Sequence, residues 1–260
     1  MRIVIGLEYR GAGFCGWQSQ PQGCGVQDAL ETAVSAIAGA RTPVVAAGRT
    51  DTGVHAAFQV AHFDVAVVRP LTAWVRGVNS HLPPGVAVLW AREVGVDFHA
   101  RFAATERGYR YVLLNHPVRP GLRDGLVGWH HRPLDVAAMN AAAGHLLGRH
   151  DFSAFRAAEC QARSPVKEVR LACIERRGDY LLCDFRADGF LHHMVRNLMG
   201  CLVQIGAGAQ PPDWLREVRD SRDRTRAAPT FDAAGLYLTH IRYPAHFALP
   251  ENSERWPFAT

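Results

Sequence analysis

The chain has 260 residues, a net charge of +5 and 48% hydrophobic residues. This length is sufficient to bury a sizeable core, in one large domain or in two of about half the size. No apolar stretch approaches the ~20 residues that cross a bilayer. The first residues also lack the pattern of a signal peptide, a positively charged segment followed by an apolar one. We therefore expect a cytoplasmic protein with no membrane span and no export signal.

The basic residues are almost all arginine, since 28 arginines accompany a single lysine, Lys167. The planar guanidinium suits phosphate and stacks on bases, which favours a nucleic-acid partner, although a codon bias across a genome gives the same composition. The six cysteines form no C-x-x-C pair and no spacing typical of zinc ligands. We expect them to be reduced thiols.

The first half of the chain predicts a β-α-β-β-α-β order. Bulky residues fall at every second position from Arg2 to Tyr9, which is typical of a strand, and a glycine-rich loop follows. Apolar residues then recur at helical spacing from 26 to 37 and stop before Gly39. Further elements are expected as strands at 43–47, 57–64 and 86–94 and as a helix at 71–80. This order is that of ferredoxin-like domains.

The second half repeats similar elements in a similar order. We expect strands at 109–114, 169–175, 180–185 and 236–242 and helices at 134–147 and 190–205. The prediction is an α+β fold of two ferredoxin-like, RRM-like halves that form a mostly antiparallel sheet. The expected domains are 1–104 and 105–245, followed by a tail at 246–260. If residues 177–179 form the hairpin loop, Cys173 and Cys183 face each other and pack as small apolar groups.

One carboxylate lies in a loop that suits chemistry. The segment Gly48-Arg49-Thr50-Asp51-Thr52-Gly53-Val54-His55 follows an apolar run, so Asp51 lies where a strand leads into a tight turn. Residues at such junctions are held rigidly and stay reachable by a ligand, which suits a nucleophile. The same letters are common in plain turns in which Asp bonds its own backbone, and this interpretation stays open.

The helix expected at 190–205 carries a single charge, Arg196, among apolar residues. A buried guanidinium is costly unless it meets a carboxylate, and we predict Asp51 as its partner. Such a pair would lower the pKa of the carboxyl group and keep Asp51 anionic, as a nucleophile requires. The alternatives are that Arg196 extends to the surface or pairs with another acid of the scaffold.

The strand that begins at Tyr109 offers an aromatic ring for base stacking. In a strand Tyr109 and Tyr111 share one face and Arg110 takes the other. Stacking of a base on such a ring contributes ~1 to 3 kcal/mol, although Tyr111 is expected to be plain core. The histidine pairs 130–131 and 192–193 are expected to be structural or to contact RNA, not to bind metal.

Other functional classes have weaker support. The chain has no phosphate-binding G-x-x-x-x-G-K-[ST] loop, no G-x-S-x-G elbow and no H-E-x-x-H pattern. A hydrolase with an aspartyl nucleophile is disfavoured because no second cluster of acids for a metal is apparent. A non-catalytic RNA-binding or tRNA-folding protein on the same scaffold stays open as the main alternative.

Several motifs follow one another in an order that resembles the tRNA pseudouridine synthase A family, from about Ile3 to Pro244. They are Gly48-Arg49-Thr50-Asp51-x-Gly53-Val54-His55-Ala56, Tyr9-x-Gly11-x-x-Phe14-x-Gly16-Trp17-Gln18, Arg107-x-Tyr109-x-Tyr111, Gly148-x-His150-Asp151-Phe152, Gln161-x-x-Ser164-Pro165, Phe190-x-x-x-Met194-Val195-Arg196-Asn197 and Gly235-Leu236-Tyr237-Leu238. Two positions depart from the family's pattern: Arg10 replaces an acid, and Gly85 replaces a common Asp. Both departures concern loop detail and the fit of tRNA.

The resemblance implies a role for each matched site residue. Asp51 would attack the target uridine, Tyr109 would stack on the uracil and move a proton, and Arg196 would hold the aspartate by an ion pair. The remaining substrate-binding residues would be Leu236, which packs against the base, Arg49, which helps to extrude the nucleotide, and His55.

The family isomerises uridines at positions 38, 39 and 40 of the tRNA anticodon arm. It acts as a homodimer whose joint basic cleft holds the tRNA, and it uses no cofactor and no metal. By the resemblance, the same properties are expected of this chain. Whether Asp51 first attacks the sugar carbon or the uracil ring stays open.

Overall fold

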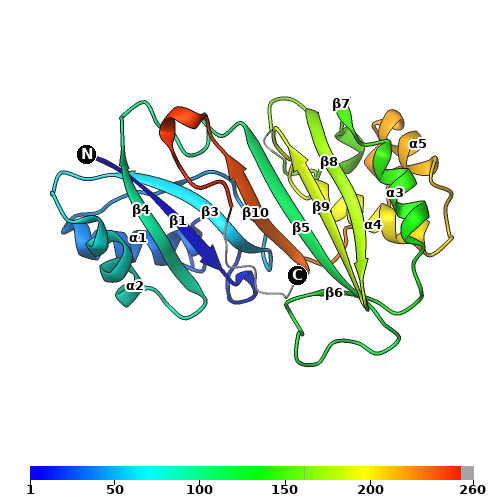
Figure 1. The fold of residues 1–260 in the computed structure, drawn as a ribbon, viewed down its shortest axis with the longest axis horizontal. Helices are drawn as coiled ribbons and strands as arrows, with labels where there is room; N and C mark the ends of the chain where they lie inside the picture. The colour runs from blue at the N-terminus through cyan, green and yellow to red at the C-terminus, as the bar shows by residue number, and fades with distance from the viewer. Residues whose placement is uncertain (161, 253–260) are drawn as a thin grey trace. The chain divides into compact units, whose positions relative to one another are not determined.

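The computed structural model describes residues 1–160 and 162–252, which form two compact units. Unit 1 is Met1–Glu106 together with the segment that begins at Tyr237, and unit 2 is Arg107–Leu236. Each unit combines helices with a sheet of mostly antiparallel strands (Figure 1). The predicted α+β class is therefore confirmed. Gln161 of one family motif and residues 253–260 of the expected tail lie outside the described residues.

Unit 1 is built around β1 (Arg2–Tyr9), which pairs antiparallel with β3 (His55–Asp64) on one side and with β4 (Val86–Val94) on the other. The short β2 (Val45–Ala46) pairs antiparallel with β3, and β10 (Leu236–Arg242) pairs with it in parallel. Both faces of β1 and β3 are buried, because the side chains that point to either face are mainly apolar.

The first helix of unit 1, α1 (Val26–Ala38), ends where the sequence indicates. Its apolar residues at helical spacing are buried, and Gly39 closes it in the left-handed region with φ 73°. The helix expected at 71–80 is present, since residues 71–81 are helical, and it contains a π-helical segment at Ala73–Gly77 that continues into α2 (Val78–His81). Figure 1 shows α1 and α2 side by side in this unit.

Unit 2 has the strand order β5 (Glu106–Asn115), β9 (Tyr180–Ala187), β8 (Val166–Arg177) and β7 (Gly148–Asp151). The short β6 (Gly128–His130) pairs in parallel with β5. The helices are α3 (Val136–Gly144), α4 (Met194–Gly206) and α5 (Trp214–Ser221). The two longest helices of the described chain, α1 and α4, have 13 residues each, and none of the described helices is long and apolar enough to span a bilayer.

The hairpin of β8 and β9 folds one residue later than expected. Arg177 pairs with Tyr180, so the loop is the two-residue Gly178-Asp179, with Gly178 at φ 57°. Cys183 therefore lies opposite Ile174 and not opposite Cys173. Because side chains alternate between the faces of a sheet, the shift of one residue separates the two cysteines, and the expected facing pair is wrong.

The expectation of reduced thiols is wrong for Cys15 and Cys24, which form a disulfide. The loop between them returns on itself, because the Cys15 N–H donates to the carbonyl oxygen of Cys24 at 2.9 Å. This places the two Cα atoms 5.4 Å apart, within the range that a disulfide spans. Four further cysteines are free thiols, namely Cys160, Cys173, Cys183 and Cys201.

A buried histidine in β3 makes the stability of unit 1 dependent on pH. His62 is 4% exposed, and its Nδ1 accepts the N–H of Ala100 at 3.2 Å. Burial, reinforced by the positive charge of Arg2, lowers the pKa of His62 to about 4. Between pH 6.5, the approximate pKa of histidine in the unfolded chain, and about pH 4, His62 is therefore mostly protonated in the unfolded chain and mostly neutral in the folded chain.

The free energy of unfolding should consequently fall as pH decreases from about 6.5 towards 4, with a loss near pH 5 of about 2 kcal/mol from His62 alone. Urea titrations at a series of pH values measure this loss. In the variant His62→Asn, an amide oxygen replaces Nδ1 as acceptor and does not titrate, so the difference between the two proteins isolates the contribution of His62. If the free energy of unfolding changes equally with pH in the two proteins, His62 is not the source of the pH dependence.

Candidate active site

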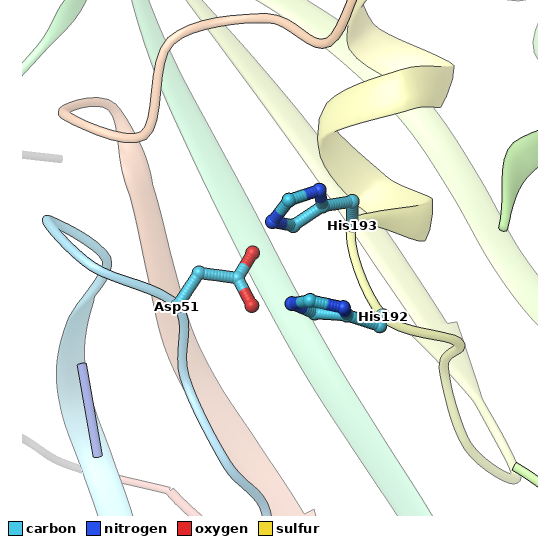
Figure 2. A group of neighbouring side chains, drawn as sticks. All are labelled: Asp51, His192 and His193. Carbon is cyan, nitrogen blue, oxygen red and sulfur yellow. The ribbon is translucent and has the colours of Figure 1, made fainter. Parts of the chain in front are cut away.

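In unit 1 the carboxylate of Asp51 is carried by the tight loop that joins β2 to β3, and its residue is half-buried (Figure 2). The N–H of Val54 donates to the carbonyl oxygen of Asp51 at 3.1 Å, and Gly53 has φ 79°. A turn with this positive φ requires glycine or a residue that tolerates the left-handed region. The sequence Asp-Thr-Gly therefore turns the chain directly after the acid.

The glycine-rich segment before α1 packs directly on this loop. The N–H of Trp17 donates to the carbonyl oxygen of Thr50 at 2.9 Å. A β-carbon on Gly16 would lie 2.8 Å from the same oxygen and 3.2 Å from the carbonyl carbon of Asp51, so only glycine permits this approach. The backbone on both sides of Asp51 is thus held by its neighbours in the same unit.

Arg49 lies on the loop before Asp51, and His55 is the first residue of β3, directly after the loop. The His55 ring is 1% exposed, its Nδ1 accepts the N–H of Gly11 at 3.1 Å, and it stacks on Tyr237 with ring centroids 4.6 Å apart. These contacts hold the start of β3 in place. Arg49 is exposed, two residues before the acid.

In unit 2 the tyrosines of β5 have different environments. Tyr109 is half-buried and meets the ring of Phe190 edge to face, with centroids 5.2 Å apart. Tyr111 is fully buried, and its hydroxyl donates to the carbonyl oxygen of Asp232 at 2.9 Å, so the expected core role of Tyr111 is confirmed. Arg110 forms a two-point salt bridge with Asp184 at 2.8 and 2.9 Å.

Arg196 is half-buried in the first turn of α4. Its Nε donates to the carbonyl oxygen of Phe231 at 2.9 Å, and its own carbonyl oxygen accepts the N–H of Phe231 at 3.1 Å. The first bond ties the guanidinium to the 231 segment, and the second ties the backbone of Arg196 to it. Arg196 is therefore a positioned group, not a side chain that extends along the surface.

The helix α4 begins at Met194, four residues later than expected. His193 precedes it with φ 62°, a left-handed conformation that interrupts the helical path. Figure 2 shows His192 and His193 on the segment that leads into α4, and their rings lie with centroids 4.0 Å apart. Asn197, directly after Arg196, is fully buried and donates to the carbonyl oxygen of Phe155 at 2.8 Å.

The expected site residues thus fall into two groups. Arg49 and Asp51 lie on one loop of unit 1, and His55 begins the strand that follows it. The others come from three elements: Tyr109 from β5, Arg196 from α4 and Leu236, which is 4% exposed, from the first position of β10.

Sequence reasoning gave no role to several residues that support the loop of Asp51. They are Tyr9, Thr50 and Gln59, which are joined by buried hydrogen bonds. One signal for them was present, because Gln59 is an amide with apolar residues on both sides, in the segment Ala56 to Ala61. A buried polar residue in such a place is retained only with hydrogen-bond partners.

Comparison with known proteins identifies what the chain resembles. A family model described as tRNA pseudouridine synthase matches residues 7–103 and 142–244. The first matched range includes the loop of Asp51, and the second includes Arg196 and Leu236.

Three similar curated proteins are each named tRNA pseudouridine synthase A. The protein from Thiobacillus denitrificans is 84% identical over 259 residues, which is 100% of both chains. The proteins from Chromobacterium violaceum and Dechloromonas aromatica are 60% and 58% identical, and each alignment covers 98% of this chain and 97% of the relative.

Proposed function

Because this chain belongs to the tRNA pseudouridine synthase family, we propose that it isomerises uridine to pseudouridine in tRNA, with Asp51 as the nucleophile. The observation that carries the proposal is the position of Asp51. Its loop lies inside the matched family range and is fixed on both sides by glycine-mediated backbone contacts. Such rigidity suits a group that must meet one atom of a bound base.

The chemistry needs one anionic group and a closed site for the base. The N1–C1′ glycosidic bond of uridine breaks, the uracil turns, and C5 forms a new bond to C1′. The proton on C5 leaves to solvent and N1 gains a proton, so product and substrate are isomers and nothing is oxidised or reduced. A carboxylate that adds to the sugar carbon or to the ring and then leaves again fulfils this requirement.

We assign the guanidinium of Arg196 to an ion pair with Asp51 in the working enzyme. An opposite charge favours the ionised carboxylate, which is the reactive form. The bond from Nε of Arg196 to the carbonyl oxygen of Phe231 supports this role, since it restricts the direction of the guanidinium. An Arg196→Gln variant should accordingly keep its fold, measured by circular dichroism, and lose most of its rate.

Tyr109, Leu236, Arg49 and His55 complete the proposed substrate site. The half-buried ring of Tyr109 would stack on the uracil and its hydroxyl would move a proton, while Leu236 packs against the base. The target base must leave its stack, at a cost of a few kcal/mol that stacking and phosphate contacts offset. Arg49 would help to extrude the nucleotide. His55, at the buried start of β3, would be a further substrate-binding residue.

Family membership supports a more specific proposal for the target uridines and the assembly. We propose that the target uridines are at positions 38, 39 and 40 of the anticodon arm, that the protein acts as a homodimer in the cytoplasm, and that no cofactor or metal is needed. Light scattering of the purified protein tests the assembly, since a homodimer has twice the chain mass of 28.6 kDa. Mapping of modified positions in tRNA tests the target.

Release of tritium from tRNA labelled at C5 of uridine tests the reaction directly. Purified protein alone, without added cofactor, should release tritium and convert uridine to pseudouridine. A non-catalytic tRNA-binding protein would bind the same tRNA and release none. That outcome, with binding intact, would replace the proposed isomerase by the alternative.

A further inference from the structure

Three polar side chains are buried together in the apolar interior of unit 1, next to the loop of Asp51. Tyr9, Thr50 and Gln59 are 4%, 6% and 0% exposed. They come from the end of β1, from the loop and from the middle of β3. Buried polar groups are costly unless they bond one another, so their arrangement has a structural or functional reason.

Gln59 contacts the start of the loop. Its Nε2 donates to the carbonyl oxygen of Gly48 at 2.7 Å and to the hydroxyl oxygen of Tyr9 at 3.4 Å. A primary amide has two N–H donors, so both are used in this support. The Oε1 atom accepts the N–H of Val60 at 3.2 Å, which fixes the amide orientation.

Tyr9 links Gln59 to the residue beside the acid. Its hydroxyl oxygen lies 2.8 Å from Oγ1 of Thr50. Either oxygen can donate in this bond, and the Tyr9 oxygen also accepts an N–H of Gln59. Burial raises the pKa of Tyr9 to about 12, so the phenol keeps its proton throughout the physiological range.

Thr50 is the residue directly before Asp51, and it is held at two atoms. Its Oγ1 meets Tyr9, and its carbonyl oxygen accepts the N–H of Trp17 at 2.9 Å. The ring of Trp17 also packs against the ring of Tyr9, with centroids 5.9 Å apart. The peptide that leads into Asp51 is therefore fixed through its side chain and its backbone.

We propose that Tyr9, Thr50 and Gln59 are positioning residues, and that their hydrogen-bonded chain sets the place of the Asp51 carboxylate for catalysis. The inference rests on the proposed role of Asp51. None of the three residues is assigned to contact the substrate. Their effect is on the rate of the chemical step, because a displacement of about 1 Å at a reacting group costs roughly 100-fold.

The variant Tyr9→Phe removes one oxygen atom and keeps the ring. We expect its single-turnover rate constant to fall roughly 10- to 100-fold at a temperature where it is fully folded, with tRNA affinity unchanged. The matched control is Tyr243→Phe, because the Tyr243 hydroxyl is also buried in unit 1 and donates to the carbonyl oxygen of Ala100 at 2.8 Å. The control should lose similar stability and keep the wild-type rate.

Substitutions at Thr50 separate the hydroxyl from the shape of the residue. Thr50→Val keeps the shape and loses the hydroxyl, so it should match the rate of Tyr9→Phe. Thr50→Ser keeps the hydroxyl and should stay near the wild-type rate. The double variant Tyr9→Phe/Thr50→Val should be no slower than either single variant, since both remove the same bond.

The outcomes distinguish this inference from the proposed function. If the wild type releases no tritium, or if Asp51→Asn is active, the proposed function fails. If the wild type is active and Asp51→Asn is not, yet Tyr9→Phe has the wild-type rate, only the positioning role fails. Additive losses in the double variant, or an equal loss of rate in Tyr243→Phe, would likewise overturn it.

Discussion

Asp51→Asn is expected to abolish pseudouridine formation while tRNA binding stays nearly intact. The amide has the size of the carboxylate and preserves the turn, but it carries no charge and is a poor nucleophile. Loss of a nucleophile lowers turnover by at least about 1,000-fold, whereas the binding surface for a polyanion is spread over many arginines. Tritium release measures the first quantity, and a filter-binding titration measures the second.

The control for this change is Asp64→Asn, the same substitution at the other end of β3. Asp64 forms a two-point salt bridge with Arg2, and its side chain is 62% exposed. An exposed pair of this kind contributes little, about 0 to 1 kcal/mol, so this variant should fold and keep the wild-type rate. Full activity of Asp51→Asn would remove Asp51 from the mechanism.

Gly16→Ala should damage both the fold of the glycine-rich segment and the loop of Asp51. Gly16 has φ 93°, and an added β-carbon would lie 2.8 Å from the carbonyl oxygen of Thr50 and 3.1 Å from the N of Thr52. The left-handed conformation alone costs roughly 1–2 kcal/mol, and the close contact adds to it by pushing the loop of Asp51 away. We expect lower thermal stability and roughly a 100-fold slower single turnover.

Gly13→Ala is the matched control, three residues earlier in the same segment. A β-carbon there meets no atom within 4 Å, and Gly13 has no positive φ. The melting temperature and single-turnover rate of this variant should equal those of the wild type. Equal behaviour of the two alanine variants would show that the approach of Gly16 to the loop has no importance for the site.

The elements with strong periodicity could be predicted from the sequence almost to the residue. The strands at 2–9, 86–94 and 236–242 agree with the structure, and so does the helix that ends at Gly39. Each element has a long periodic pattern of apolar residues and a clear residue signal at its end, so the local sequence is sufficient to predict it. The resemblance to the family is likewise confirmed.

The departures come from contacts that the local pattern does not contain. The helix α4 begins later than predicted because His193 adopts a left-handed conformation, which is rare for a residue that is not glycine. The hairpin register depended on one loop residue, and a shift of one exchanges the two faces of a strand. The disulfide between Cys15 and Cys24 required the path of the loop, since spacing alone does not define pairing.

For the site, the sequence singled out the acid but not its support. Asp51 can be recognised from the residues next to it in the sequence. The role of Tyr9 and Gln59 becomes apparent only when the pairing of β1 with β3 is known. Their hydrogen bonds to the loop exist only in the folded sheet. Residues that act through tertiary contacts are therefore the part of a site that a single sequence conceals.

The parallel pairing of β10 with β3 has a consequence for how the protein is made. Tyr237, which stacks on His55 beside the loop of Asp51, is translated long after that loop. At ordinary rates of elongation the delay is roughly ten to forty seconds. The loop of Asp51 therefore emerges from the ribosome with its early neighbours but without the ring of Tyr237, which only the last stretch of the message supplies.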